Sequence, residues 1–129
     1  TGARYHVAHL STKNAMAMVA EAKRRGLRVT CEVTPHHFAL HDQEIIPYDS
    51  NYRMKPPIRC NHDLDAMIAG IRAGVVDAIA TDHAPHSVTD KMQEFERCPF
   101  GILGLETAIG LTLERLVSPG HISVTRMVE

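Results

Sequence analysis

Apolar positions recur along the chain with two spacings, and these predict three strands and three helices. Short apolar runs predict strands at residues 27–33 and 75–81, and a similar short run predicts one at residues 4–10. Helices are predicted where apolar residues recur on one helical face, at residues 12–25, 63–74 and 105–117. Because strands alternate with helices, the pattern indicates an α/β protein with a parallel sheet.

Two long loops interrupt this order, at residues 40–61 and 87–104. Pro47, Pro56 and Pro57 exclude a continuous helix through the first loop. Loops of this length in a compact domain are usually functional. The order fits either a doubly wound sheet or part of a (β/α)8 barrel, and both folds bind ligands at the C-terminal ends of their strands.

Composition narrows the class of protein. The 129 residues carry a net charge of −1 and no basic stripe, so we expect no nucleic-acid partner. Apolar runs are too short for a membrane span, and no signal segment opens the chain. Three cysteines without a CxxC pair favour reduced thiols in the cytoplasm. Both ends look cut, so we interpret residues 1–129 as a fragment of one domain.

The chain contains nine histidines, and this excess is informative because several of them follow predicted strands. The third strand leads into Thr81-Asp82-His83-Ala84-Pro85-His86. A carboxylate at a strand end can bind a metal ion or move a proton, so Asp82 is a candidate for either role. The alternative is an aspartate that caps the loop beside solvated histidines.

Two further histidine pairs lie at strand ends. Residues three apart in a strand point to opposite faces, so we expect His6 and His9 not to share a site. His9 is the better ligand candidate because it lies nearer the strand's C-terminal end, although a satisfied core histidine is the alternative. Of His36 and His37, at most one can reach a site from an extended backbone.

A proline-rich segment, residues 51–59, contains three Arg and Lys side chains that can bind an anion. The alternative is a solvated basic loop. Cys60-Asn61-His62 lacks a partner cluster and is interpreted as structural.

Five stretches together resemble the dihydroorotases of the amidohydrolase superfamily. They are H-V-A-H-L-S-T-K (6–13), V-T-C-E-V-T-P-H-H (29–37), N-Y-R-M-K-P-P-I-R (51–59), D-A-I-A-T-D-H-A-P-H (77–86) and P-F-G-I-L-G-L-E-T-A (99–108). The resemblance covers essentially the whole chain, and T-D-H-A-P-H followed by P-F-G-I-x-G-x-E-T is specific. It implies zinc-dependent, reversible cyclisation of N-carbamoyl-L-aspartate to L-dihydroorotate in pyrimidine biosynthesis.

The resemblance also implies a (β/α)8 barrel with a binuclear zinc centre, of which this chain would supply the last three βα units. In the family pattern His9 matches a metal ligand, and Asp82 matches a metal ligand that is also the general base and acid. His86, Phe100 and Gly101 match substrate-binding positions. Lys55 stands where the family commonly has Asn, so we expect it to bind substrate with altered hydrogen bonding.

Most of the family's metal ligands would lie upstream of residue 1, so we expect these 129 residues alone to have little or no activity. Other cyclic amidohydrolases, namely a hydantoinase, dihydropyrimidinase or allantoinase, are the nearest alternative. A non-catalytic dihydroorotase-like subunit that scaffolds aspartate transcarbamoylase is another, and a plain structural α/β domain is the simplest. The resemblance further implies a small-molecule substrate and a homo-oligomer.

Overall fold

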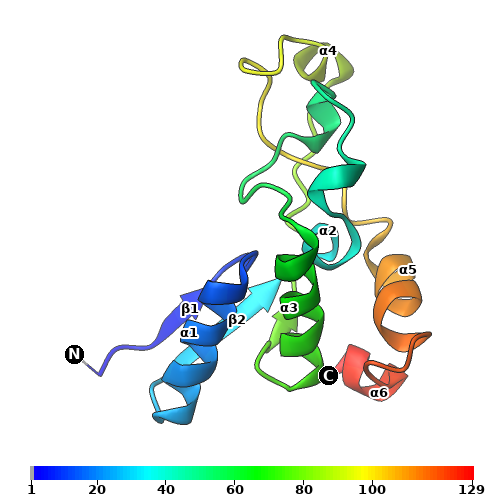
Figure 1. Ribbon diagram of the computed structural model, residues 1–129. Helices are drawn as coiled ribbons and strands as arrows, with labels where there is room; N and C mark the ends of the chain where they lie inside the picture. Colours follow the sequence, from blue (N-terminus) through cyan, green and yellow to red (C-terminus); the bar gives the residue numbers. More distant parts are fainter. Residues whose placement is uncertain (1) are drawn as a thin grey trace.

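The three predicted strands form one parallel sheet with the order β1-β2-β3 (Figure 1). The computed structural model describes residues 2–129. The strands are β1 (Tyr5–Val7), β2 (Val29–Val33) and β3 (Ala78–Ile79). They are shorter than predicted: β1 ends at Val7, and β2 and β3 begin two and three residues later than the predicted ranges.

Two amphipathic helices, α1 (Lys13–Arg24) and α3 (Asn61–Arg72), lie side by side against the sheet (Figure 1). The Thr12 hydroxyl accepts the Ala15 N–H and caps α1. Both helices agree with the predicted ranges to within a few residues. The apolar core joins them to the sheet and contains Leu10, Met16, Val19, Cys31, Val33, Phe38, Ala39, Met67, Ile71, Val76 and Leu116.

The predicted helix at residues 105–117 is wrong in its first turn and in its regularity. The helix α5 begins only at Ala108 (Ala108–Thr112) and continues as a π-helical turn, η3 (Leu113–Val117). Residues 105–107 form a turn instead, and the amides of Gly104 and Leu105 donate to the His83 ring. A last helix, α6 (Val124–Val128), follows.

The strand-end histidines 36 and 37 lie in a short helix, α2 (Pro35–Ala39), and not on an extended backbone as predicted. Proline is favoured in the first turn of a helix because its missing N–H has no partner to lose there. Both imidazoles are therefore buried in the body of the protein.

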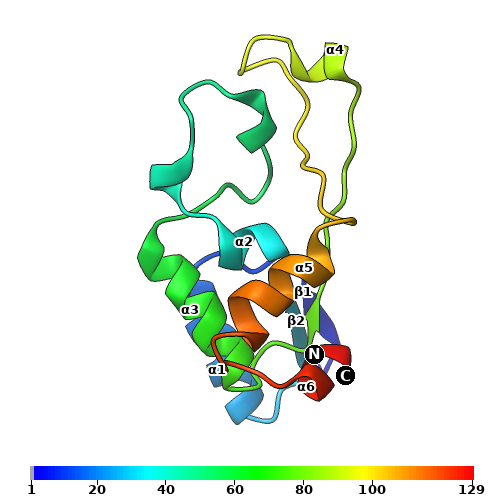
Figure 2. The same cartoon turned by 90° about the vertical axis from the view of Figure 1, so that its right-hand side faces the viewer.

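Two loops extend together away from the sheet (Figures 1 and 2). We call residues 40–60 and 84–104 the loop region, and residues 2–39, 61–83 and 105–129 the sheet body. The loop region contains only short helical turns, which are η1 (Asp42–Glu44), η2 (Ser50–Tyr52) and α4 (Val88–Lys91). The prediction of no continuous helix in the first loop is confirmed.

Within residues 2–129, no helix is long and apolar enough to cross a membrane. Cys31, Cys60 and Cys98 are all free thiols, as predicted.

Candidate functional site

His9 and Asp82 meet at the C-terminal edge of the sheet. Nε2 of His9 lies 3.6 Å from Oδ1 of Asp82. The two side chains meet although their strands are not neighbours, because β2 lies between β1 and β3. Both residues have left-handed backbones, with φ of 52° and 47°. Such conformations are costly for non-glycine residues and concentrate at functional sites.

A third polar side chain, Glu32 on β2, was missed by the sequence reasoning. Its Oε1 lies 2.9 Å from Nδ1 of His9, and its Oε2 lies 3.2 Å from Nε2 of His6. The His9 contact has ion-pair distance without the alignment of a straight hydrogen bond. A lone carboxylate within the apolar run V-T-C-E-V was the available signal.

The expectation that His6 and His9 point apart is wrong, since both contact Glu32. Strand alternation ends with β1 at Val7, and the positive φ of His9 then turns its ring back toward β2. Of these two histidines, only His6 lies within the strand, so the alternation of faces does not apply to His9.

The paired histidines of α2 have different surroundings. His37 contacts the Thr34 hydroxyl at 2.6 Å and the Pro56 carbonyl at 3.1 Å, so it joins α2 to the proline-rich segment. His36 is 4% exposed and its Nε2 has no hydrogen-bond partner among the described residues. Burial, with His37 and His9 close by, lowers the pKa of His36 to about 3, so its ring is neutral near pH 7.

His83, which follows β3, is joined by hydrogen bonds to the chain that precedes α5. Its Nδ1 accepts the N–H groups of Gly104 at 3.1 Å and Leu105 at 3.2 Å. A ring nitrogen that accepts a hydrogen bond carries no proton, so Nδ1 of His83 acts here as an acceptor. Its role in the structure is to anchor the chain that precedes α5.

The substrate-binding candidates His86, Phe100 and Gly101 lie together in the loop region. Nε2 of His86 donates to the Phe100 carbonyl at 2.9 Å. Gly101 has a φ of 150°, and a Cβ there would lie 2.6 Å from the Ala84 carbonyl oxygen. Only glycine allows this close approach of the two loop segments.

Lys55 belongs to the same group. Its Nζ lies 4.3 Å from the centre of the Phe100 ring, and the Arg53 guanidinium lies 4.3 Å from that ring. Two cations therefore lie beside one aromatic ring, at the distance of a cation–π contact. A groove of about 940 Å³ lies next to it and is lined by residues that include His86 and Gly101, whereas His9, Asp82 and Lys55 do not line it.

Across residues 2–129, no group of three or more His, Cys, Asp or Glu side chains is arranged to hold a metal ion. His9 and Asp82 by themselves present one imidazole nitrogen and one carboxylate oxygen at close range. Zinc accepts both donor types, so this pair suits two positions of a zinc site but not a complete one.

Comparison with known proteins shows that the chain is similar to curated dihydroorotases. The enzyme of that name from Solibacter usitatus is 65% identical over 130 residues, which covers 100% of this chain and 30% of the relative. Dihydroorotase from Shouchella clausii is 48% identical over 99% of this chain and 30% of the relative. The expected resemblance to dihydroorotases is confirmed. The chain spans about 30% of the length of these dihydroorotases, and no protein-family model matches it.

Solved structures with the same fold as this chain are also found. A D-hydantoinase (dihydropyrimidinase) from Thermus sp. matches with a TM-score of 0.87 and 30% identity, over 99% of this chain and 29% of that protein. Dihydropyrimidinase from Brevibacillus agri matches with a TM-score of 0.90 at 24% identity, over 98% of this chain and 29% of that protein. The α/β fold with its small parallel sheet is thus shared with cyclic amidohydrolases.

Proposed function

We propose that this chain is part of a zinc-dependent dihydroorotase, which interconverts N-carbamoyl-L-aspartate and L-dihydroorotate in pyrimidine biosynthesis. The observation that carries the proposal is the approach of His9 Nε2 to Asp82 Oδ1 at 3.6 Å, at the strand ends where α/β enzymes bind ligands. The 65% identity to a curated dihydroorotase supports this choice of reaction.

The architecture we propose is part of a (β/α)8 barrel, with β1, β2 and β3 as its last three strands. Parallel strands with helices packed outside support this proposal. In such a barrel His9 and Asp82 would face the same C-terminal mouth as ligands supplied from elsewhere in the protein.

His9 and Asp82 would hold zinc through an imidazole nitrogen and a carboxylate oxygen. When bound, zinc supplies a Lewis acid that polarises a carbonyl and lowers the pKa of a bound water. Glu32, in contact with the other nitrogen of His9, would orient that ring, as carboxylates commonly do for metal-binding histidines.

Asp82 would also move the proton of the reaction. In hydrolysis, the oxygen of water bonds to the ring amide carbon of dihydroorotate and the carbon–nitrogen bond breaks. Asp82 would take a proton from the attacking water and give it to the departing nitrogen, which needs its carboxylate within hydrogen-bond reach of both atoms. Cyclisation of carbamoyl aspartate reverses these steps.

Lys55, His86 and the backbone of Phe100 and Gly101 would bind the substrate. Dihydroorotate carries a carboxylate, and the cations beside Phe100 offer it a positive environment. A lysine at position 55 can neutralise that carboxylate as a point charge.

The proposal is tested by transplanting this chain into Solibacter usitatus dihydroorotase in place of its matching segment. The chimera should hydrolyse dihydroorotate, and changing His9 to Ala should reduce both turnover and bound zinc. A chimera that folds cooperatively and binds zinc but does not turn over dihydroorotate would contradict the proposed function.

The nearest alternative is a hydantoinase or dihydropyrimidinase, favoured by the 30% identity to the Thermus enzyme. Assaying the protein at its full natural length with dihydroorotate, hydantoin, dihydrouracil and allantoin separates these functions. We expect turnover of dihydroorotate to exceed that of the others.

We further propose that the protein acts in the cytoplasm as a homo-oligomer, with aspartate transcarbamoylase as a candidate partner. The free thiols support a reducing compartment. Size-exclusion chromatography with and without the transcarbamoylase tests both associations.

A further inference from the structure

Lys91, at the end of α4, makes an unusual set of contacts for a lysine in a loop. Its Nζ lies within hydrogen-bond distance of the carbonyl oxygens of Ser50 at 2.9 Å, Pro99 at 3.1 Å and Arg53 at 3.3 Å. The Ser50 hydroxyl donates in return to the Lys91 carbonyl. An ammonium group has three N–H donors, so these carbonyls use all of them.

The three carbonyls belong to both loops, so Lys91 ties one loop to the other. Arg53 strengthens the same connection, because its carbonyl also accepts the Gly101 N–H at 2.9 Å. Its guanidinium donates to the Cys98 carbonyl and lies over the Phe100 ring. Cys98, Phe100 and Gly101 thus contact Arg53 directly, and Pro99 is joined to the same segment through Lys91.

Two simpler roles for Lys91 do not fit these contacts. A solvated surface lysine would not be half-buried with every donor directed at a backbone carbonyl. A direct ligand for an anion would need a free N–H, and the three carbonyls leave none.

We propose that Lys91 is a positioning residue that holds the Phe100–Gly101 segment beside Lys55 and His86, and so sets the affinity of the site for its substrate. This inference rests on the proposed function. Lys91 touches neither the substrate nor the reacting atoms, and it acts through the backbone it fixes.

The test compares K91M with K91R in the protein at its full natural length. Met keeps most of the side-chain length and removes the ammonium, whereas Arg keeps a cation. Since hydrogen bonds from charged groups are strong, K91M should raise the KM for dihydroorotate roughly tenfold, with kcat changed by less than about twofold. K91R should recover most of the loss. Lys13 is exposed on α1, and K13M should match the wild type.

Hydrogen exchange supplies a readout that does not depend on turnover. The Gly101 amide should exchange faster in K91M, while the amides of β2 keep their wild-type rates. Unchanged KM and unchanged Gly101 exchange in K91M would overturn the inference, as would a fall in kcat at constant KM. Absence of dihydroorotate turnover in the wild type would instead contradict the proposed function, and the exchange experiment would still test Lys91. If K91M does not fold, K91Q replaces it under the same criteria.

Discussion

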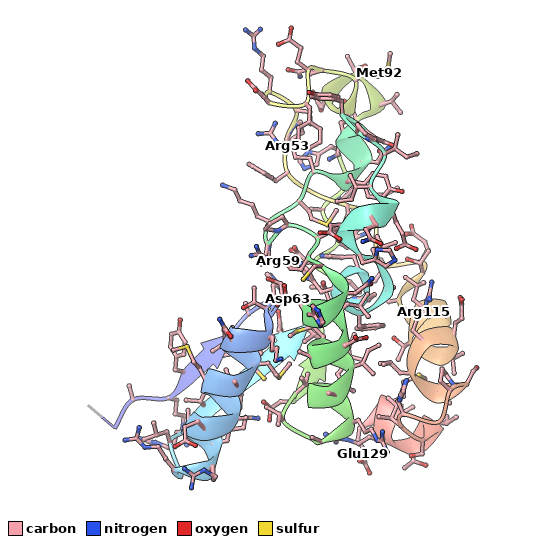
Figure 3. The ribbon with its side chains drawn as sticks, in the orientation of Figure 1. Arg53, Arg59, Asp63, Met92, Arg115 and Glu129 are labelled. Atoms are coloured by element: carbon pink, nitrogen blue, oxygen red, sulfur yellow. The ribbon has the colours of Figure 1, made fainter. Side chains whose placement is uncertain are left out.

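The sheet body and the loop region are each stabilised by different interactions. In the sheet body, apolar side chains such as Val33, Met67 and Leu116 are fully buried between the strands and helices. In the loop region, a smaller buried group contains Met54, Ile58 and Cys98. Cations that contact carbonyls and aromatic rings join the two loops of that region, and Figure 3 shows Arg53 among its side chains, with Met92 at the far end.

The two regions also differ in the functions that we propose for their residues. The candidates for metal binding and proton transfer, His9 and Asp82, follow strands of the sheet body. The candidates for substrate binding, Lys55, His86, Phe100 and Gly101, belong to the loop region. Rigid elements hold reacting groups more accurately, whereas loops vary more readily between related enzymes. The comparison predicts that changes in the two regions affect different measured quantities.

The largest effect is expected for Asp82→Asn. An amide cannot accept and return the proton, so kcat should fall roughly a hundred- to ten-thousandfold, while the fold is kept. The measurement is kcat for dihydroorotate in the full-length protein, with circular dichroism as the control for folding. Activity within tenfold of the wild type would show that Asp82 does not transfer the proton.

A pair of methionines compares the packing of the two regions. Met67→Ala in the sheet body removes a side chain that is 0% exposed, and should lower the free energy of unfolding by about 2–5 kcal/mol. Met92→Ala in the loop region removes one that is 80% exposed, and should change it by less than about 0.5 kcal/mol. Urea denaturation measures both. Equal losses would mean that the loop region is packed as tightly as the sheet body.

Acid sensitivity should originate in the sheet body, at His36. Its pKa is lowered to about 3 by burial, whereas the same histidine in the unfolded chain has its ordinary value. Between these two values the unfolded state binds a proton that the folded state does not. Stability from this site is therefore complete above the unfolded pKa and declines as pH falls, by at most about 1.4 kcal/mol per pH unit. His36→Asn should flatten this decline in metal-free protein, and identical slopes would refute the assignment.

Among the predicted changes in catalysis, the smaller one is expected for His86→Ala in the loop region. Removing the ring also removes its hydrogen bond to the Phe100 carbonyl, so substrate binding should weaken and KM should rise roughly tenfold. We expect kcat to change much less than in Asp82→Asn. A kcat loss as large as that of Asp82→Asn would place His86 with the reacting groups. It would contradict the proposal that the sheet body carries the reacting groups and the loop region binds the substrate.

Much of the sheet body could be predicted from the sequence, because its signals are local. The apolar runs at 27–33 and 75–81 contain β2 and β3, and helical spacing located α1 and α3. The start of the helix after Gly104 could not be placed correctly, since the preceding segment is held by hydrogen bonds to His83, about twenty residues away, which leave no periodic signal.

The sequence by itself determined the order of the three strands with α1 and α3 between them, the strand ends that carry His9 and Asp82, and the resemblance to dihydroorotases. These follow from short-range periodicity and from motif residues that are adjacent in the chain. Only the tertiary structure decided that Glu32 contacts both His6 and His9, and that Lys91 joins two loops. Such contacts depend on the backbone turn at His9 and on packing between segments far apart in the chain, and neither leaves a periodic signal in the sequence.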